Sequence, residues 1–150
     1  MAAEDRIQAR AVTPRPIPLQ TDRTALERVL HDAAHVSGGY ATALAQPADL
    51  ADVVGVVQSS STVLAIGSQS SLTGGATPRG ETLVELRGLQ GIERVGAERW
   101  RVGAGLTLDE IQVHLARHDA FYPPVPAYAG AQIGGAASTN AAGPATFKYG

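Results

Sequence analysis

The chain has 150 residues, of which 44% are hydrophobic and 17% charged, and its formal net charge is −2. This composition predicts a folded domain rather than a disordered segment, and it gives no reason to expect a nucleic-acid partner, because nucleic acids bind clustered cations. The sequence has no cysteine, which excludes disulfides and thiolate nucleophiles and is typical of a reducing compartment, so we expect a cytoplasmic protein.

Residues 1–20 are expected to form an N-terminal tail or lead-in strand. Glu4 and Asp5 interrupt the stretch, which has no apolar segment of the kind found in a secretory signal. Prolines at 14, 16 and 18 oppose both helix and sheet. Nowhere does the sequence contain the run of roughly 20 apolar residues that a membrane helix needs.

A first helix is expected to begin at Thr24, which can form a capping box with Glu27, and to stop near the glycines at 38–39. The apolar face of this helix would consist of Leu26, Val29, Leu30 and Ala33. A short strand is expected at 40–44.

A second helix is expected to open at Pro47, since proline suits a first turn and Asp49 and Asp52 favour the positive end of the helix dipole. Serines at 59–61 end it. The apolar run at 62–66 predicts a strand covered on both faces. The expected buried face of the helix is Leu50, Val53, Val54 and Val57.

Further strands are expected at 83–86 and, as a hairpin, at 92–95 and 100–104 around residues 96–99. A third helix begins at Thr107, capped reciprocally by Glu110, and ends near 118–119. Its inward residues are Leu108, Ile111 and Leu115, with Val113 as a further candidate. The pattern predicts an α+β fold with an N-terminal α/β subdomain and part of a second, antiparallel subdomain. Because the hairpin has no further strand to pair with, the domain is expected to be truncated.

The loop at 67–75 (GSQSSLTGG) follows a predicted strand directly. Small residues such as Gly67 and Gly74 let the backbone approach a ligand closely, and successive N–H groups can form an anion-binding nest. Hydroxyl donors from the serines suit the same anion, and a diphosphate fits this set. The loop has neither the Walker A ending nor the G-x-G-x-x-G spacing, and an ordinary turn-rich connection is the alternative.

The stretch 121–150 has few bulky apolar residues and little periodicity. Stretches of this length without regular structure are usually functional or disordered. Gly134 and Gly135 permit backbone contact with a planar or phosphorylated ligand, and Asn140 can hydrogen-bond a ligand or its own backbone. A flexible tail is the alternative interpretation.

Four motifs in this order resemble those of a known family: IGSQSSLTGG at 66–75, VGAGLTLDEI at 102–111, PPVP at 123–126 and IGGAASTNAAG at 133–143 followed by KYG at 148–150. Together they are similar to the vanillyl-alcohol-oxidase-type (PCMH-type) FAD-binding domain. The resemblance covers about residues 40–150. The nearest subgroup is that of FAD-linked D-2-hydroxy-acid dehydrogenases, such as D-lactate dehydrogenase and the glycolate oxidase flavin subunit.

The resemblance implies a domain over residues 21–150 that binds FAD through both glycine-rich segments. The first segment would hold the diphosphate, and the second would line the pyrophosphate, ribityl and flavin portions. Ser70 stands where some relatives carry a flavin-linking histidine, and the chain has no cysteine, so non-covalent FAD is expected. This chain departs from the commoner first loop, since Ile66 replaces an arginine. The implied cofactor-binding residues are Gly67, Ser68, Gln69, Ser70, Ser71, Gly74, Pro123, Pro124, Gly134, Gly135, Ser138, Asn140, Ala142, Gly143 and Tyr149.

The function implied by the resemblance is oxidation of a D-2-hydroxy acid such as lactate or glycolate. A missing domain or a partner chain would bind the hydroxy-acid substrate, and the sequence nominates no catalytic residue. Three alternatives stay open. These are a non-catalytic flavin- or nucleotide-binding subunit, an interaction module with flexible glycine loops, and a flavin reductase of the cell-wall precursor type.

Two histidine pairs have the spacing of metal ligands, His31 with His35 and His114 with His118. Neither pair has the glutamate of an H-E-x-x-H motif or an obvious third ligand. We therefore expect no metal site.

Overall fold

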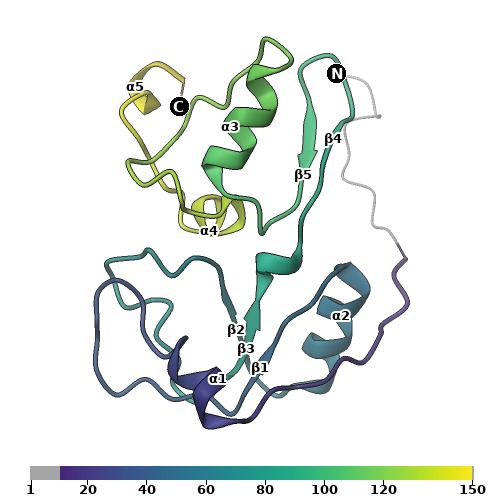
Figure 1. Cartoon of the computed structure of the whole chain (residues 1–150), viewed down its shortest axis with the longest axis vertical. Helices are drawn as coiled ribbons and strands as arrows, with labels where there is room; N and C mark the ends of the chain where they lie inside the picture. Colours follow the sequence, from purple (N-terminus) through teal and green to yellow (C-terminus); the bar gives the residue numbers. More distant parts are fainter. Residues whose placement is uncertain (1–10, 150) are drawn as a thin grey trace.

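The computed structural model describes residues 11–149, so half of the expected tail at 1–20 and the glycine that ends the KYG motif lie outside the described residues. The chain forms two halves, one built on a small parallel sheet and the other on a β-hairpin with three helices (Figure 1). The α+β prediction, with an α/β subdomain followed by an antiparallel element, is confirmed. No helix of residues 11–149 combines the length and apolarity needed to cross a membrane.

The parallel sheet consists of β1 (Ala43–Ala45), β3 (Thr82–Glu85) and β2 (Val63–Ile66), in that spatial order. Leu44, Ile66 and Leu83 are almost completely buried and form its core with Val29. The expectation that the 62–66 strand is covered on both faces is wrong. Strand β2 pairs only with β3 and lies at the edge of the sheet, where the Val63 residue remains 38% exposed.

Helix α1 (Arg23–Glu27) is much shorter than the predicted helix, and Asp22 rather than Thr24 caps it by accepting a hydrogen bond from the Ala25 N–H. Farther along the predicted helix, the buried Asp32 carboxylate accepts from the N–H of Ala34, two residues on, as in an Asx turn, which is not a helical conformation. The same carboxylate accepts a bond from Ala76 N–H. Asp32 therefore ties this segment to the end of the 67–75 loop.

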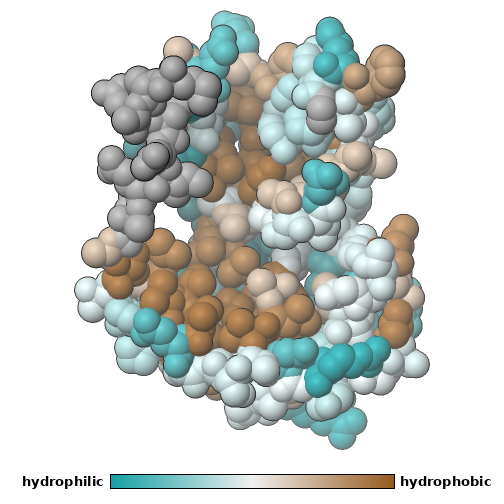
Figure 2. Space-filling model, turned by 180° about the vertical axis from the view of Figure 1, so that it is seen from behind, coloured by the Kyte–Doolittle hydropathy of each residue, from teal (hydrophilic) through white to brown (hydrophobic). Residues whose placement is uncertain are grey.

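Helix α2 (Leu50–Ser59) begins three residues later than the predicted start at Pro47, because the Asp49 side chain caps it by accepting from Asp52 N–H. Its predicted buried face is wrong. Leu50 and Val57 are 53% and 50% exposed, whereas Val56 is the buried apolar residue. Exposed apolar surface gathers on this half of the molecule (Figure 2).

The preceding segment explains which face of α2 is covered. The Arg15 guanidinium bonds the carboxylates of Asp49 and Asp52, and Arg15 N–H donates to Ala51 O. The Arg15 carbonyl lies so close to Gly55 that a Cβ there would stand 2.1 Å from it. Residues of the lead-in segment thus lie along α2, a contact that the periodicity of the helix alone does not reveal.

The hairpin and the helix that follows it match the prediction closely. Strands β4 (Ile92–Arg94) and β5 (Trp100–Val102) form the antiparallel hairpin. Helix α3 (Leu108–Ala116) has the predicted capping box between Thr107 and Glu110, and it buries Leu108, Ile111 and Leu115. It ends two residues earlier than predicted, and Val113 is exposed.

The segment after α3 contains two short helices that the sequence did not reveal, α4 (Ile133–Ser138) and α5 (Thr146–Tyr149). Main-chain bonds hold α4 in place, because Ile133 N–H donates to Leu106 O and Gly134 N–H donates to Ala104 O. Thr107 also forms an isolated bridge with Gln132. The turn at 103–107 thereby places α4 beside the carboxyl ends of the parallel strands (Figure 1).

Candidate functional site

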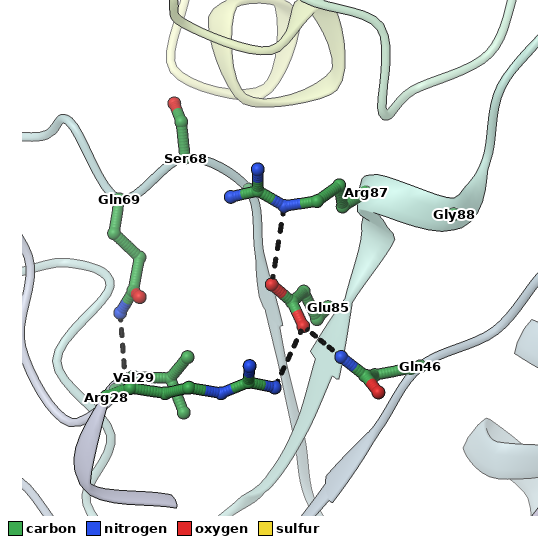
Figure 3. Close-up of a pocket in the computed structure, with 9 residues that line it drawn as sticks. Arg28, Val29, Gln46, Ser68, Gln69, Glu85, Arg87 and Gly88 are labelled. Carbon is green, nitrogen blue, oxygen red and sulfur yellow. Dashed lines mark hydrogen bonds and ion pairs between the residues drawn. The ribbon is translucent and has the colours of Figure 1, made fainter. Parts of the chain in front are cut away.

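The carboxyl ends of the three parallel strands open into one cavity of about 660 Å³. Gln46 directly follows β1, Gly67 directly follows β2, and Glu85 is the last residue of β3. Open α/β sheets bind their ligands in a crevice at this edge. The lining is Arg28, Val29, Gln46, Gly67, Ser68, Gln69, Glu85, Arg87 and Gly88 (Figure 3).

Hydrogen bonds from the Gln69 side chain hold the loop at 67–75 in place, while several of its main-chain N–H groups remain unpaired within the described part of the chain. The Gln69 side chain donates from Nε2 to the carbonyls of Val29 and Ala76, at 3.0 Å each, and Gln69 has a left-handed φ of 50°. The main-chain N–H groups of residues 68–71 donate to no other group within residues 11–149. A half-buried row of unpaired N–H donors is the feature that an anionic ligand requires.

The hydroxyls of this loop pair among themselves. Ser68 Oγ donates to Ser70 Oγ at 3.4 Å, and Ser71 Oγ shares a hydrogen bond of 2.9 Å with Thr73. Of the loop residues predicted to bind the ligand, residues 67–69 line the cavity, and Ser70, Ser71 and Gly74 do not. Gly74 has a φ of 76°, which the turn itself requires.

The second predicted segment meets the first through Gln132. A Cβ atom on Gly67 would lie 2.7 Å from Gln132 Oε1. Gln132 is only 3% exposed, it occupies the N-cap position of α4 without making a capping bond, and its Oε1 has no hydrogen-bond partner within residues 11–149. The sequence analysis missed this residue. Its position directly before the Ile-Gly-Gly motif was the available signal.

The two glycines of α4 have different surroundings. A Cβ on Gly134 would lie 2.8 Å from the Ala104 Cβ, whereas a Cβ on Gly135 would meet nothing within 4 Å. Gly134 is therefore needed for packing against the 103–105 turn, and Gly135 offers its bare backbone to open space. Ser138 Oγ donates to the Gly134 carbonyl, and exposed Asn140 has a φ of 49° just beyond the helix end.

The PPVP segment lies against the end of the second glycine-rich stretch. A Cβ on Gly143 would stand 1.8 Å from the Val125 carbonyl oxygen, so only glycine fits there. Pro123 and Pro124 are half-buried, and Ala142 is exposed. Exposed Tyr149 lies edge-on to Phe121, with ring centroids 5.8 Å apart. None of these predicted residues lines the cavity at the strand ends.

Charged side chains in the cavity were also missed. Glu85 accepts a hydrogen bond of 2.6 Å from Gln46 Nε2 and lies 3.8 Å from an Arg28 nitrogen and 3.5 Å from Arg87 Nε (Figure 3). The cavity therefore carries two cations and one anion. Within residues 11–149, no group of three or more histidine and carboxylate side chains has the arrangement of a metal site.

Unpaired loop amides, bare glycine backbone and arginines at the carboxyl edge of a parallel sheet define a domain that binds a phosphate-containing cofactor. The sequence model of one family, described as an FAD binding domain, matches residues 41–150. The chain belongs to this FAD-binding domain family, and its cofactor is FAD.

The relative and the similar solved structures are longer than this chain. The chain is 35% identical over 86 residues to a D-lactate dehydrogenase of Archaeoglobus fulgidus, a match that covers 56% of this chain and 19% of that protein. It therefore spans about a fifth of the curated relative that it matches.

Two solved structures share the fold at lower sequence identity. Cholesterol oxidase from Brevibacterium sterolicum has a TM-score of 0.57 at 24% identity, covering 68% of this chain and 22% of its own. GilR, an oxidoreductase solved with pregilvocarcin, has a TM-score of 0.59 at 24% identity, covering 73% and 23%.

The site residues fit FAD on their own chemistry. The N–H groups of residues 68–71 can bind phosphate oxygens, and the unpaired Gln132 Oε1 offers an acceptor to a ligand hydroxyl or N–H. The open face of Gly135 permits close approach of a planar group. These features lie on both sides of the junction between Gly67 and Gln132.

Proposed function

We propose that this chain is the FAD-binding part of a flavin-dependent oxidoreductase that oxidises a D-2-hydroxy acid such as lactate or glycolate. The single observation that carries the proposal is the junction of the two glycine-rich segments at Gly67 and Gln132, in a chain that belongs to the FAD-binding domain family. The substrate class is supported by the similarity to D-lactate dehydrogenase.

FAD, when bound, supplies hydride-transfer chemistry, and the protein binds and orients it. In this proposal the amides of residues 67–71 bind the diphosphate, and Gly135 with the rest of the 133–143 segment borders the ribityl and flavin portions. Gly74, Pro123, Pro124 and Tyr149 stay in the proposed site as residues that shape these segments. The FAD-binding unit is proposed as residues 21–150 after a tail at 1–20, with the hydroxy acid bound by groups outside this chain.

FAD binding is tested by titrating the purified chain with FAD and following the quenching of flavin fluorescence. We expect saturable binding, and we expect acid denaturation to release all flavin into the supernatant, because the proposed binding is non-covalent. No saturable uptake of FAD would overturn the proposal. Flavin that stays with the precipitate would overturn the non-covalent mode alone.

The substrate class needs a separate experiment on the protein in which this chain occurs. Under anaerobic conditions, D-lactate, glycolate or D-2-hydroxyglutarate is expected to bleach the flavin absorbance, with L-lactate as the stereochemical control. FAD binding without bleaching by any of these acids would overturn the hydroxy-acid assignment and favour a non-catalytic flavin-binding subunit. Bleaching by NADPH instead would identify a reductase. A cytoplasmic location, consistent with the cysteine-free sequence, is tested by cell fractionation.

A further inference from the structure

The loop that faces the diphosphate carries no cation of its own. Residues 67–75 include neither lysine nor arginine, and their main-chain amides contribute dipoles rather than net charge. A diphosphate bound in a partly enclosed site is stabilised by cations close to its oxygens. The arginines of the adjoining cavity, Arg28 and Arg87, are in a position to supply this charge.

Arg87 has the freer guanidinium of the two. It extends from the 3₁₀ helix η2 (Leu86–Gly88) toward Ser68, beneath α4 (Figure 3). Its Nε lies 3.5 Å from Glu85 Oε1, and its two Nη groups donate to no residue in the described chain. The side chain is 67% exposed, so a ligand in the cavity can reach these donors directly.

Arg28 is more constrained. Its Nε donates to the Ala25 carbonyl at 3.2 Å, and one Nη lies 3.8 Å from Glu85. Glu85 itself is 11% exposed and is fixed by the 2.6 Å bond from Gln46. The fixed Glu85 carboxylate therefore pairs with Arg87 through Nε. The two Nη groups of Arg87 remain available to a ligand beside the loop.

We propose that Arg87 binds the FAD diphosphate directly, supplying the positive charge that the 67–75 loop lacks, and that Glu85 is its positioning residue. This inference rests on the proposed function, because it requires FAD in the cavity. Arg87 and the amides of residues 68–71 then contact the same anion from two sides, one through charge and the other through main-chain dipoles.

The test compares FAD and riboflavin, which lacks phosphate, by fluorescence titration of the unchanged chain and of Arg87→Gln. We expect Arg87→Gln to weaken FAD binding about tenfold, the loss of one charge-assisted contact, without changing riboflavin binding. Arg87→Lys should fall between the two, because it keeps the charge without the planar fork. The control is Arg117→Gln, which removes an exposed arginine at the end of α3 and should leave both affinities unchanged.

Salt and a second substitution supply independent readouts. Raising the salt concentration should narrow the FAD affinity gap between the unchanged chain and Arg87→Gln, because ions screen the contact. Glu85→Gln should weaken FAD binding less than Arg87→Gln, and the double variant should bind no more weakly than Arg87→Gln alone, because the two residues act as one unit.

Equal FAD affinity of Arg87→Gln and Arg117→Gln would overturn the role of Arg87 and leave the proposed function intact. An equal loss of riboflavin and FAD binding would also overturn it, since a purely structural role predicts that result. If the unchanged chain binds no FAD, the proposed function fails and the assignment of Arg87 fails with it.

Discussion

Gly67 and Gln132 approach each other so closely that a Cβ atom on Gly67 would lie 2.7 Å from Gln132 Oε1. Gly67 begins the loop after β2, and Gln132 directly precedes α4 at its N-cap position. This contact joins two glycine-rich segments that are distant in sequence, one in the parallel-sheet half and the other in the hairpin half. Changes at either residue should therefore affect the other.

Gly67→Ala is expected to lower the free energy of unfolding by about 1 kcal/mol, because the new methyl group displaces the Gln132 side chain. The loss should largely disappear when Gln132→Ala is added, since the truncated side chain leaves room. Urea unfolding of the two single variants and the double variant measures this coupling. Fully additive losses would contradict a direct contact between the two residues.

Gln132→Met tests the unpaired amide oxygen. An unsatisfied buried acceptor destabilises the fold by about 1–3 kcal/mol, so replacing the amide by a thioether of similar shape should raise the melting temperature of the FAD-free chain. If a ligand group satisfies Oε1 in the complex, the same variant should bind FAD more weakly than the unchanged chain. Thermal unfolding with and without FAD separates the two effects. A lower melting temperature of Gln132→Met without FAD would show that the unpaired amide oxygen does not destabilise the FAD-free chain.

Features encoded by neighbouring residues were predictable from the sequence. The capping box of Thr107 with Glu110 and the hairpin around residues 96–99 depend on contacts a few residues apart, and both are confirmed. The course of the chain after α1 and the covered face of α2 were not predictable in this way. They depend on the Asp32 carboxylate bonding Ala76 and on Arg15 lying along α2, contacts that link distant positions.

The binding site shows the same division. Small residues after a strand indicated the 67–75 loop, because the need for close backbone approach is visible in composition. Arg87 had no such signal, and Gln132 had only its position directly before the Ile-Gly-Gly motif. An arginine in a short helix and a glutamine before two glycines acquire a role only when the fold brings the strand ends and α4 together.

Acid should weaken the attachment of the lead-in segment to α2. Hydrogen bonds from Arg15 hold the pKa of both Asp49 and Asp52 below the ordinary value of 3.8. A carboxyl group whose pKa is lower in the folded chain stabilises the fold above its unfolded pKa, and this stabilisation is lost as the pH falls through the folded pKa. Unfolding by urea should therefore become easier below about pH 4.

The matched variants are Arg15→Gln and Arg23→Gln. Arg15→Gln should be less stable than the unchanged chain at pH 7. It should also lose less stability when the pH is lowered from about 5 to below about 4, because the ion pairs of Arg15 are already absent. Arg23 pairs with Glu27 on the exposed surface of α1, where ion pairs contribute little, so Arg23→Gln should retain the pH dependence. Identical pH profiles for both variants would show that the Arg15 contacts do not govern acid stability.

The adjacent glycines of α4 offer a comparison within one helical turn. Alanine favours a helix over glycine by up to about 1 kcal/mol, and this preference applies to both positions. At Gly135 the new methyl group meets nothing within 4 Å, whereas at Gly134 it would lie 2.8 Å from the Ala104 Cβ. Gly135→Ala should therefore raise the free energy of unfolding, and Gly134→Ala should lower it by about 1–3 kcal/mol through overpacking.

The Gly135→Ala substitution should have opposite effects on the stability of the chain and on its affinity for FAD. If the bare backbone of this residue faces the cofactor, the stabilising Gly135→Ala substitution should weaken FAD binding, because a methyl group then occupies the approach of the ligand. Urea unfolding without FAD and fluorescence titration with FAD, carried out on the same protein samples, measure both effects. A variant that is more stable and binds FAD as tightly as the unchanged chain would remove Gly135 from the proposed binding face, while the packing role of Gly134 would stand.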